Sequence, residues 1–189
     1  MTNPARYTRV AAILHWLIAL LIVAAVILGV WANYAPDAWV RPMIDTHKSL
    51  GITVLGLAVL RLLWRLWHQP PQLPAGYPRW ERLAAHGAHA ALYVWIFALP
   101  ITGWLHDSAW NQAATHPMRL FSVVPWFRID FIEELDPAVK EPLHTVLGTV
   151  HFWFGYVLYG LFALHVAGVL KHQWLDREPE LQRINPFGR

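Results

Sequence analysis

The chain has 189 residues, of which 56% are hydrophobic and 14% are charged, and its formal net charge is +3. This composition is unlike that of a soluble domain of the same size, and it predicts a membrane protein with no nucleic-acid partner. The absence of cysteine excludes disulfides, thiolate metal sites, iron–sulfur clusters and covalently attached c-type haem. Any metal chemistry must therefore use oxygen ligands or the eleven histidines.

Four apolar stretches are long enough to cross a bilayer as helices, the practical spanning element at this length. They cover about residues 10–33, 44–67, 83–105 and 143–170. The first stretch is too long for the apolar core of a signal peptide and lacks a clear cleavage site, so we expect it to be retained. Pro100 and Gly103 predict a kink and a close helix approach in the third stretch. The fold class is therefore predicted as an all-α, multi-pass membrane four-helix bundle.

Basic residues set the expected orientation. Ten of the fifteen Lys and Arg residues lie in segments on the same side as the N-terminus, and five lie on the other side. Because basic residues collect on the cytoplasmic side, both termini are predicted to be cytoplasmic, in the inner membrane of a bacterium. The long segment 106–142 is then periplasmic. Its mixture of apolar and charged residues predicts either a cover over a cofactor or a segment resting on lipid.

Two histidines of the last apolar stretch, His151 and His165, lie fourteen residues apart. At about 100° and 1.5 Å per residue, they share one helix face and are separated by about 21 Å along the axis. Ionisable side chains at membrane depth are costly, and they indicate function by default. The spacing predicts two functional sites at different depths, on a path across the membrane.

Depth in the membrane assigns partners to these two histidines. His15 lies near the inner end of the first helix, at the depth of His165, and His47 lies near the outer start of the second helix, at the depth of His151. Each pair can bind one haem iron from both faces, which closes the coordination sphere and favours electron transfer over oxygen binding. A zinc or copper site usually needs three or four converging ligands.

Other histidines leave alternatives open. His86 and His89 share the inner depth and can replace either inner ligand, and His144 can replace His151. We expect these three to be interfacial, supporting or substrate-site residues instead. Three further histidines lie in or beside loops, where solvated surface roles are expected: His68, His106 and His116.

Several motifs together resemble the bacterial cytochrome b561 family. They are L-H-W at 14–16, H-K-S-L-G at 47–51, R-L-L-W-R at 61–65, the His151–His165 spacing and A-G-V-L-K-H at 167–172. The resemblance covers residues 6–184 as a single transmembrane domain. It implies a four-helix bundle with two b haems, one bound by His15 and His165 and the other by His47 and His151.

The resemblance also implies a function. The family is similar to quinone-linked electron carriers of the inner membrane, one branch of which oxidises superoxide at the periplasmic side and reduces ubiquinone. Trp16 and His172 match family positions proposed to border the quinone.

The charge of the outer segments bears on the electron donor. These segments carry eight acidic residues against five basic ones, an unfavourable balance for attracting a small anion. Lys48, beside His47, and Arg41 can still form a positive opening that guides superoxide to the outer haem. We therefore expect a superoxide:ubiquinone oxidoreductase. The alternative is an electron-transfer subunit that docks a periplasmic redox protein, and a haem-free transporter or scaffold is a third reading.

Overall fold

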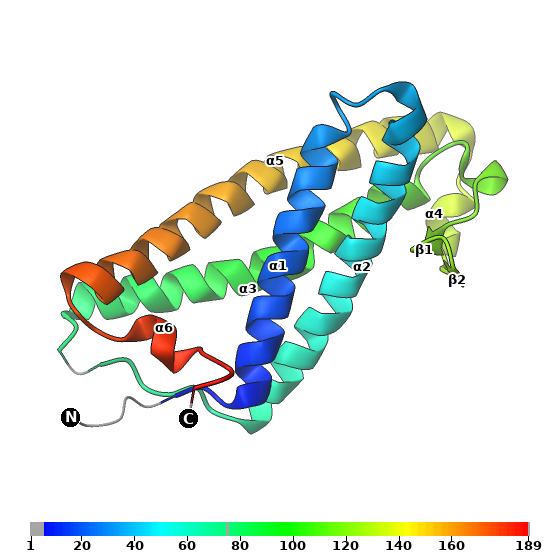
Figure 1. Cartoon of the computed structure of the whole chain (residues 1–189). Coiled ribbons are helices and arrows are strands. Elements are labelled where there is room, and N and C mark those ends of the chain that lie inside the picture. Colours follow the sequence, from blue (N-terminus) through cyan, green and yellow to red (C-terminus); the bar gives the residue numbers. More distant parts are fainter. Residues whose placement is uncertain (1–5, 75, 189) are drawn as a thin grey trace.

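The structure is a computed structural model that describes residues 6–74 and 76–188. Four long helices dominate it (Figure 1): α1 (Arg9–Trp31), α2 (Asp37–Trp67), α3 (Arg79–Ser108) and α5 (Pro137–Leu170). Each is long and apolar enough to cross a membrane, with α5 continuing to Leu175 in its span. Large apolar side chains such as Leu20, Leu66 and Leu164 are exposed on the helices, as expected where lipid is the solvent. The predicted all-α membrane bundle is confirmed.

The helices extend beyond the apolar stretches of the sequence. α2 begins at Asp37 rather than near residue 44, and α5 begins at Pro137 rather than near residue 143. The first turn of α5 is fixed by the Asp136 carboxylate, which accepts a hydrogen bond from the Ala138 amide, and by Pro137. Hydropathy misses such first turns because they contain polar and charged residues, which lower the mean hydropathy below that of a spanning stretch.

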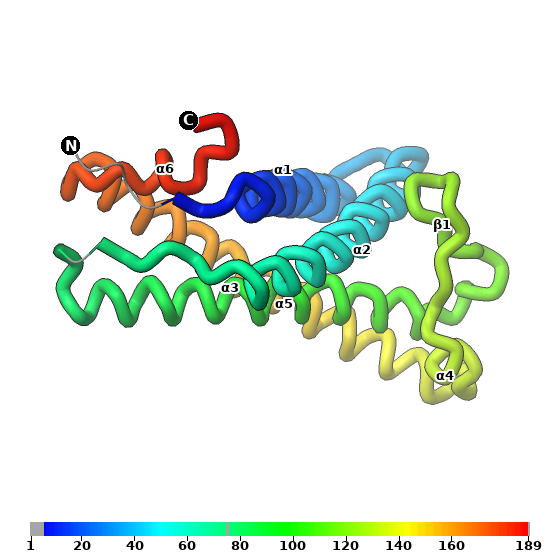
Figure 2. The backbone as a smooth tube through the Cα atoms, turned by 90° about the horizontal axis from the view of Figure 1, so that it is seen from below, coloured from blue at the N-terminus to red at the C-terminus, as the bar shows by residue number. Residues whose placement is uncertain are grey.

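The four long helices form two pairs. α1 packs along α2, α3 packs along α5, and α2 also contacts α3. Figures 1 and 2 show the two pairs crossing, with the N- and C-terminal segments near one another. We call this the terminal end of the bundle, and the opposite end, which carries the segment between α3 and α5, the loop end.

The terminal end is closed by the C-terminal segment. α5 continues into a π-helical turn, η2 (Lys171–Leu175), and a short helix, α6 (Glu180–Arg183), follows. The Tyr7 amide donates to the Arg183 carbonyl at 3.0 Å, and the Trp16 indole donates to the Ile184 carbonyl at 3.0 Å. These bonds tie the C-terminal segment to the start of α1.

The segment between α3 and α5 is folded onto the loop end. It holds the 3₁₀ turn η1 (Ala113–Thr115), the antiparallel strands β1 (Arg119–Leu120) and β2 (Val124–Pro125), and the short helix α4 (Asp130–Glu133).

Polar bonds fix this segment to the helices. The Ser49 hydroxyl of α2 accepts from the Phe121 amide at 2.8 Å, and the Ser108 hydroxyl of α3 accepts from the Ile129 amide at 3.1 Å. Val123, Phe127 and Phe131 are exposed. Polar groups of the segment thus bind the bundle while apolar side chains are exposed, and its expected role as a cover over a cofactor or as a segment resting on lipid stays a prediction.

Candidate functional site

Two pairs of histidines face one another across the bundle. The ring centroids of His15 on α1 and His165 on α5 are 6.2 Å apart, and those of His47 on α2 and His151 on α5 are 6.0 Å apart. Two imidazoles on opposite sides of one metal ion, each at a metal–nitrogen distance of about 2 Å, have centroids about 6.4 Å apart. Both pairs therefore have the spacing that a bis-imidazole iron site requires.

The loop-end pair is oriented by hydrogen bonds to backbone carbonyls. The His47 Nδ1 lies 2.7 Å from the Ala25 carbonyl oxygen, and the His151 Nδ1 lies 3.1 Å from that of Leu99 and 3.2 Å from the Thr102 hydroxyl. Because a carbonyl only accepts, each Nδ1 carries the hydrogen. The Nε2 atom of each neutral ring is then the nitrogen with a lone pair available for a metal.

A glycine allows each of these rings to reach its carbonyl. Gly29 follows Ala25 by four residues, and Gly103 follows Leu99 by four. A Cβ at Gly29 would lie 3.0 Å from the His47 ring, and one at Gly103 would lie 2.9 Å from the His151 ring. The close approach expected at Gly103 is therefore observed, and it is made to a histidine.

The same arrangement holds a third histidine. His106 Nδ1 lies 2.9 Å from the His144 carbonyl, and a Cβ at Gly148, four residues further on, would lie 2.8 Å from the His106 ring. His144 bonds the His106 carbonyl in return, and the two rings stack at 3.9 Å. The expectation that His106 is a solvated loop residue was wrong, because α3 extends to Ser108 and places the ring between helices. His144 packs on His106, whereas His151 faces His47.

The terminal-end pair lines a cavity of about 880 Å³. Cofactor and ligand sites commonly have volumes of about 300–1,000 Å³ and mostly apolar walls. The structure places Trp16 and His172, the two residues expected to border a quinone, in the same cavity wall.

Among the alternative inner histidines, His89 also lines the cavity, and its ring centroid lies 5.5 Å from that of His165. His86 is exposed and bonds the Arg82 carbonyl of its own helix at 2.6 Å. His89 is therefore the residue that can compete with His15 for the inner position, although the His15–His165 spacing is nearer to the spacing of a bis-imidazole site.

The two basic residues expected at the outer opening are both paired with carboxylates. Lys48 Nζ lies 2.5 Å from Asp107, and Arg41 Nε lies 2.9 Å from Asp45. Asp107 also binds Arg128 at 2.8 Å, and both of these side chains are 5% exposed. The group of Arg41, Lys48 and Arg128 with two aspartates keeps an excess of one positive charge, smaller than the sequence positions alone indicate.

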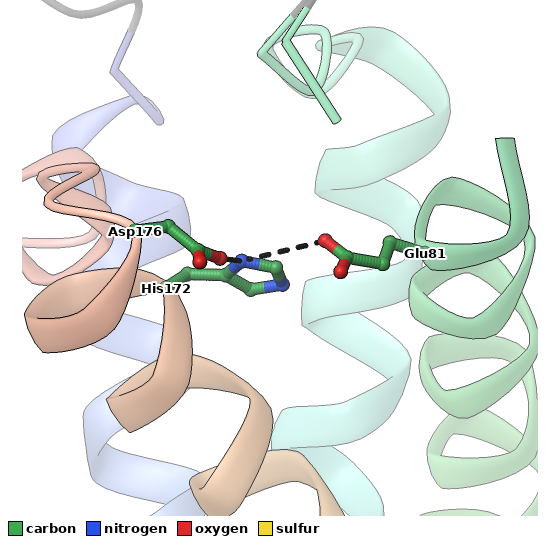
Figure 3. A group of neighbouring side chains, drawn as sticks. All are labelled: Glu81, His172 and Asp176. Atoms are coloured by element: carbon green, nitrogen blue, oxygen red, sulfur yellow. Dashed lines mark hydrogen bonds and ion pairs between the residues drawn. The ribbon is translucent and has the colours of Figure 1, made fainter. Parts of the chain in front are cut away.

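An ion-pair network lies at the terminal end beside His172 (Figure 3). His172 Nδ1 is 2.7 Å from Asp176 and 3.8 Å from Glu81. Lys171 Nζ is 2.7 Å from each of these carboxylates. Glu81, His172 and Asp176 have the spacing of a cation site, but the Lys171 ammonium already provides the cation that the two carboxylates bind. Hydrogen bonds from Lys171 and His172 lower the pKa of Asp176, so this carboxylate is ionised at neutral pH.

Tyr77 holds the His172 ring in place. The two rings stack at 4.2 Å with 17° between their planes, and the Tyr77 hydroxyl donates to Glu180 at 2.7 Å. Burial raises the pKa of Tyr77, and the hydrogen bond to Glu180 raises it further, so the phenol stays protonated. Sequence reasoning missed Tyr77, Glu81 and Asp176, which come together from two segments distant in the sequence: the start of α3 and the end of η2.

The chain matches known proteins over nearly its full length. Residues 6–186 match the family described as prokaryotic cytochrome b561. "Cytochrome b561 homolog 2" of Escherichia coli (strain K12) is 33% identical over 185 residues, covering 96% of this chain and 92% of that protein. "Cytochrome b561 homolog 1" of the same organism is 23% identical over 184 residues, covering 96% and 97%. "Probable superoxide oxidase CybB" of Yersinia pestis is 28% identical over 182 residues, covering 93% of each chain. The chain therefore belongs to the prokaryotic cytochrome b561 family, whose members bind haem b and transfer electrons in bacterial membranes.

Proposed function

We propose that this chain takes single electrons from superoxide at the loop end and passes them through two b haems to ubiquinone at the terminal end. The observation that supports this proposal best is the presence of two facing histidine pairs, with ring centroids 6.0 and 6.2 Å apart, at two depths of one bundle. Two superoxide ions give two molecules of oxygen and two electrons. The quinone takes up these electrons with two protons to become the quinol.

In this proposal His47 and His151 bind the outer haem, and His15 and His165 bind the inner haem. When bound, haem iron changes between its ferric and ferrous states and so carries one electron at a time. The protein would supply two imidazole nitrogens to each site and an apolar surround that would tune the potential. α5 provides one ligand to each site, and the fourteen-residue separation fixes the sites about 21 Å apart along this helix.

The orientation of the chain in the inner membrane belongs to the same proposal. The excess of basic residues near the termini favours a cytoplasmic terminal end and a periplasmic loop end. Superoxide then reacts on the periplasmic side, and quinone is reduced near the cytoplasmic side.

The terminal-end cavity is the proposed quinone site. Trp16 and His172 border it, and the Nδ1 of His172 is held by Asp176. With Nδ1–H donated to Asp176, the other ring nitrogen, Nε2, accepts from a quinol hydroxyl in the neutral ring and donates to a quinone carbonyl in the imidazolium form. We expect His172→Ala to slow quinone reduction and to leave the haem content unchanged.

Superoxide is proposed as the donor because of the similarity to "Probable superoxide oxidase CybB" and the cationic excess beside His47. The test is stopped-flow reduction of the oxidised protein by superoxide, with and without added ubiquinone. We expect fast reduction that slows with ionic strength and with Lys48→Gln, because salt screens attraction beyond a Debye length of about 10 Å at 0.1 M. Slow reduction that is insensitive to both changes would refute superoxide as the donor.

The second candidate donor is a basic periplasmic redox protein. The pairing of Lys48 and Arg41 with aspartates favours it, as do the exposed carboxylates of Glu134 and Asp136 at the loop end. If such a protein is the donor, neutralising Glu133, Glu134 and Asp136 should slow its docking. Under the main proposal the same triple variant should not slow reduction by superoxide and should speed it, because it removes negative charge from the end at which the anion reacts.

A further inference from the structure

Two cavities share a wall at the terminal end of the bundle. The large cavity contains the His15–His165 pair, and a second pocket of about 330 Å³ lies beside it. Tyr77, Glu81 and Lys171 line both spaces, while Asp176 and Glu178 line the smaller one. The residues that separate the two spaces therefore face the proposed quinone site on one side and a pocket lined by polar and charged groups on the other.

Glu81 is the carboxylate built into this wall. It belongs to the first turn of α3 and is 9% exposed, and its side chain binds the Lys171 ammonium at 2.7 Å. Its position lets one carboxyl group exchange a proton with water on one side and with a bound molecule on the other. A proton-transfer group in a reduction site needs this kind of access to both sides.

The network around Glu81 keeps the Lys171 ammonium paired when Glu81 is protonated. When Glu81 gains a proton, Lys171 loses the charge of one partner, but Asp176 still binds it at 2.7 Å. The hydrogen bonds from Lys171 and His172 lower the pKa of Asp176, which keeps this second partner ionised. Glu81 can therefore alternate between carboxylate and carboxylic acid without leaving the ammonium unpaired.

We propose that Glu81 carries protons from the smaller pocket to the quinone reduced in the large cavity, an inference that rests on the quinone site of the proposed function. A solvent proton that enters the smaller pocket as hydronium adds to the Glu81 carboxylate and leaves a water molecule behind. The O–H bond of this carboxylic acid breaks as an O–H bond forms on the quinone oxygen, and Glu81 returns to its carboxylate. Two such transfers, with two electrons arriving through the haem sites, convert one quinone to the quinol.

The roles of the neighbouring charged groups follow from their contacts. His172 faces the site from η2 and is fixed by Asp176 and Tyr77. The Lys171–Asp176 ion pair stays in place during each transfer, so the ammonium always has a charged partner. On α6, Glu180 is engaged by Tyr77 and Arg183, and so supports the ring stack and does not carry the proton.

The test uses the full-length haem-loaded protein, reduced in advance and mixed with a soluble ubiquinone analogue. Glu81→Gln should slow reoxidation of the haems on the order of 100-fold, within the range expected for loss of a general acid. Haem content, spectrum and reduction by superoxide should match the wild type. Glu81→Asp should recover part of the rate, and Asp176→Asn should slow reoxidation by about threefold, since a partly exposed ion pair contributes little. Glu141→Gln, an exposed glutamate on α5 at the loop end, is the matched control and should be unchanged.

The outcomes separate this inference from the proposed function. If quinone reoxidises the wild type and Glu81→Gln at the same rate, with the same proton uptake measured by an indicator dye, the inference is overturned and the quinone site stands. If quinone does not reoxidise the wild type, both are overturned. Slow reoxidation of Glu81→Gln with an unaltered spectrum and partial recovery by Glu81→Asp is the result that supports proton transfer by Glu81.

Discussion

Replacing Gly103 by alanine tests how the loop-end histidines are held. The added Cβ would lie 2.9 Å from Cε1 and 3.2 Å from Nδ1 of His151, whereas ordinary contacts begin at 3.4 Å. The His151 ring must therefore move away from α3 by about 0.5 Å. Its Nδ1 now lies 3.1 Å from the Leu99 carbonyl, and a shift of this size lengthens the contact beyond hydrogen-bonding distance.

The size of the effect can be bounded in two ways. A lost hydrogen bond costs about 0.5–1.5 kcal/mol net. Loss of a group that orients a metal-binding histidine lowers metal affinity about 10–100-fold, which corresponds to about 1.4–2.7 kcal/mol. We expect Gly103→Ala to weaken haem binding at the loop end by about tenfold or more. The midpoint potential of that haem should also rise, because a carbonyl that accepts from Nδ1–H makes the ligand more basic and stabilises ferric iron.

Haem titration of the apoprotein and a spectroelectrochemical redox titration measure both effects. Gly148→Ala introduces the same clash at His106, which belongs to neither pair, and should leave both haems unchanged. Gly87→Ala lies on the same helix as Gly103 with open space around the added Cβ, and it controls for the helix propensity of alanine. Unchanged affinity and potential in Gly103→Ala, or equal changes in Gly148→Ala, would refute the reasoning.

Three further predictions follow from the contacts. Under the proposed pairing, His47→Ala and His151→Ala should lose the same spectral component, His15→Ala and His165→Ala should lose the other, and a pyridine hemochromogen assay should find two acid-extractable haems per chain; one haem per chain would contradict the pairing. Trp16→Phe should release the C-terminal segment, because its indole bond to the Ile184 carbonyl is lost, and should slow quinone reduction without altering haem content; unchanged kinetics would place the quinone elsewhere in the cavity. Arg128→Ala should destabilise the loop end by about 1.5–3 kcal/mol, since it removes a hydrogen bond to the buried Asp107 carboxylate, which keeps Lys48 as a partner. Faster proteolysis between residues 109 and 136 would report this loss, with the exposed Arg119→Ala as the control.

The sequence was sufficient to predict the helices and the residues that face one another at each depth. Apolar length and the fourteen-residue spacing depend only on helix geometry, so His151 and His165 could be placed before any tertiary structure was known. The partners His15 and His47 followed from chain direction, because each helix reverses depth. In the structure the ring centroid of each lies within 6.2 Å of the ring centroid of its expected partner.

The remaining features depend on contacts between helices, which periodicity does not encode. Glu81 is one of twelve acidic residues, and nothing in its local sequence shows that α3 and η2 bring it to Lys171. The neutralisation of Lys48 by Asp107 likewise joins residues 59 positions apart on different helices. His106 was misplaced because the apolar stretch ends before the helix does. A glycine on a helix face that is expected to meet a histidine is the signal that could have located Gly29 and Gly103. Without a side chain at that position, the histidine can reach the backbone carbonyl four residues earlier.

The division of the four long helices into two hairpin-like pairs has a consequence for how the protein is assembled. α1 with α2, and α3 with α5, can each insert and pack as a unit, as helices do in lipid before they associate further. Each histidine pair has one member from each helix pair. A cofactor bound between the two histidines therefore links the two helix pairs late in maturation. Cells short of haem would then accumulate chains that are inserted in the membrane but whose two helix pairs are not linked. Quality-control proteases would first cleave such chains between the two pairs.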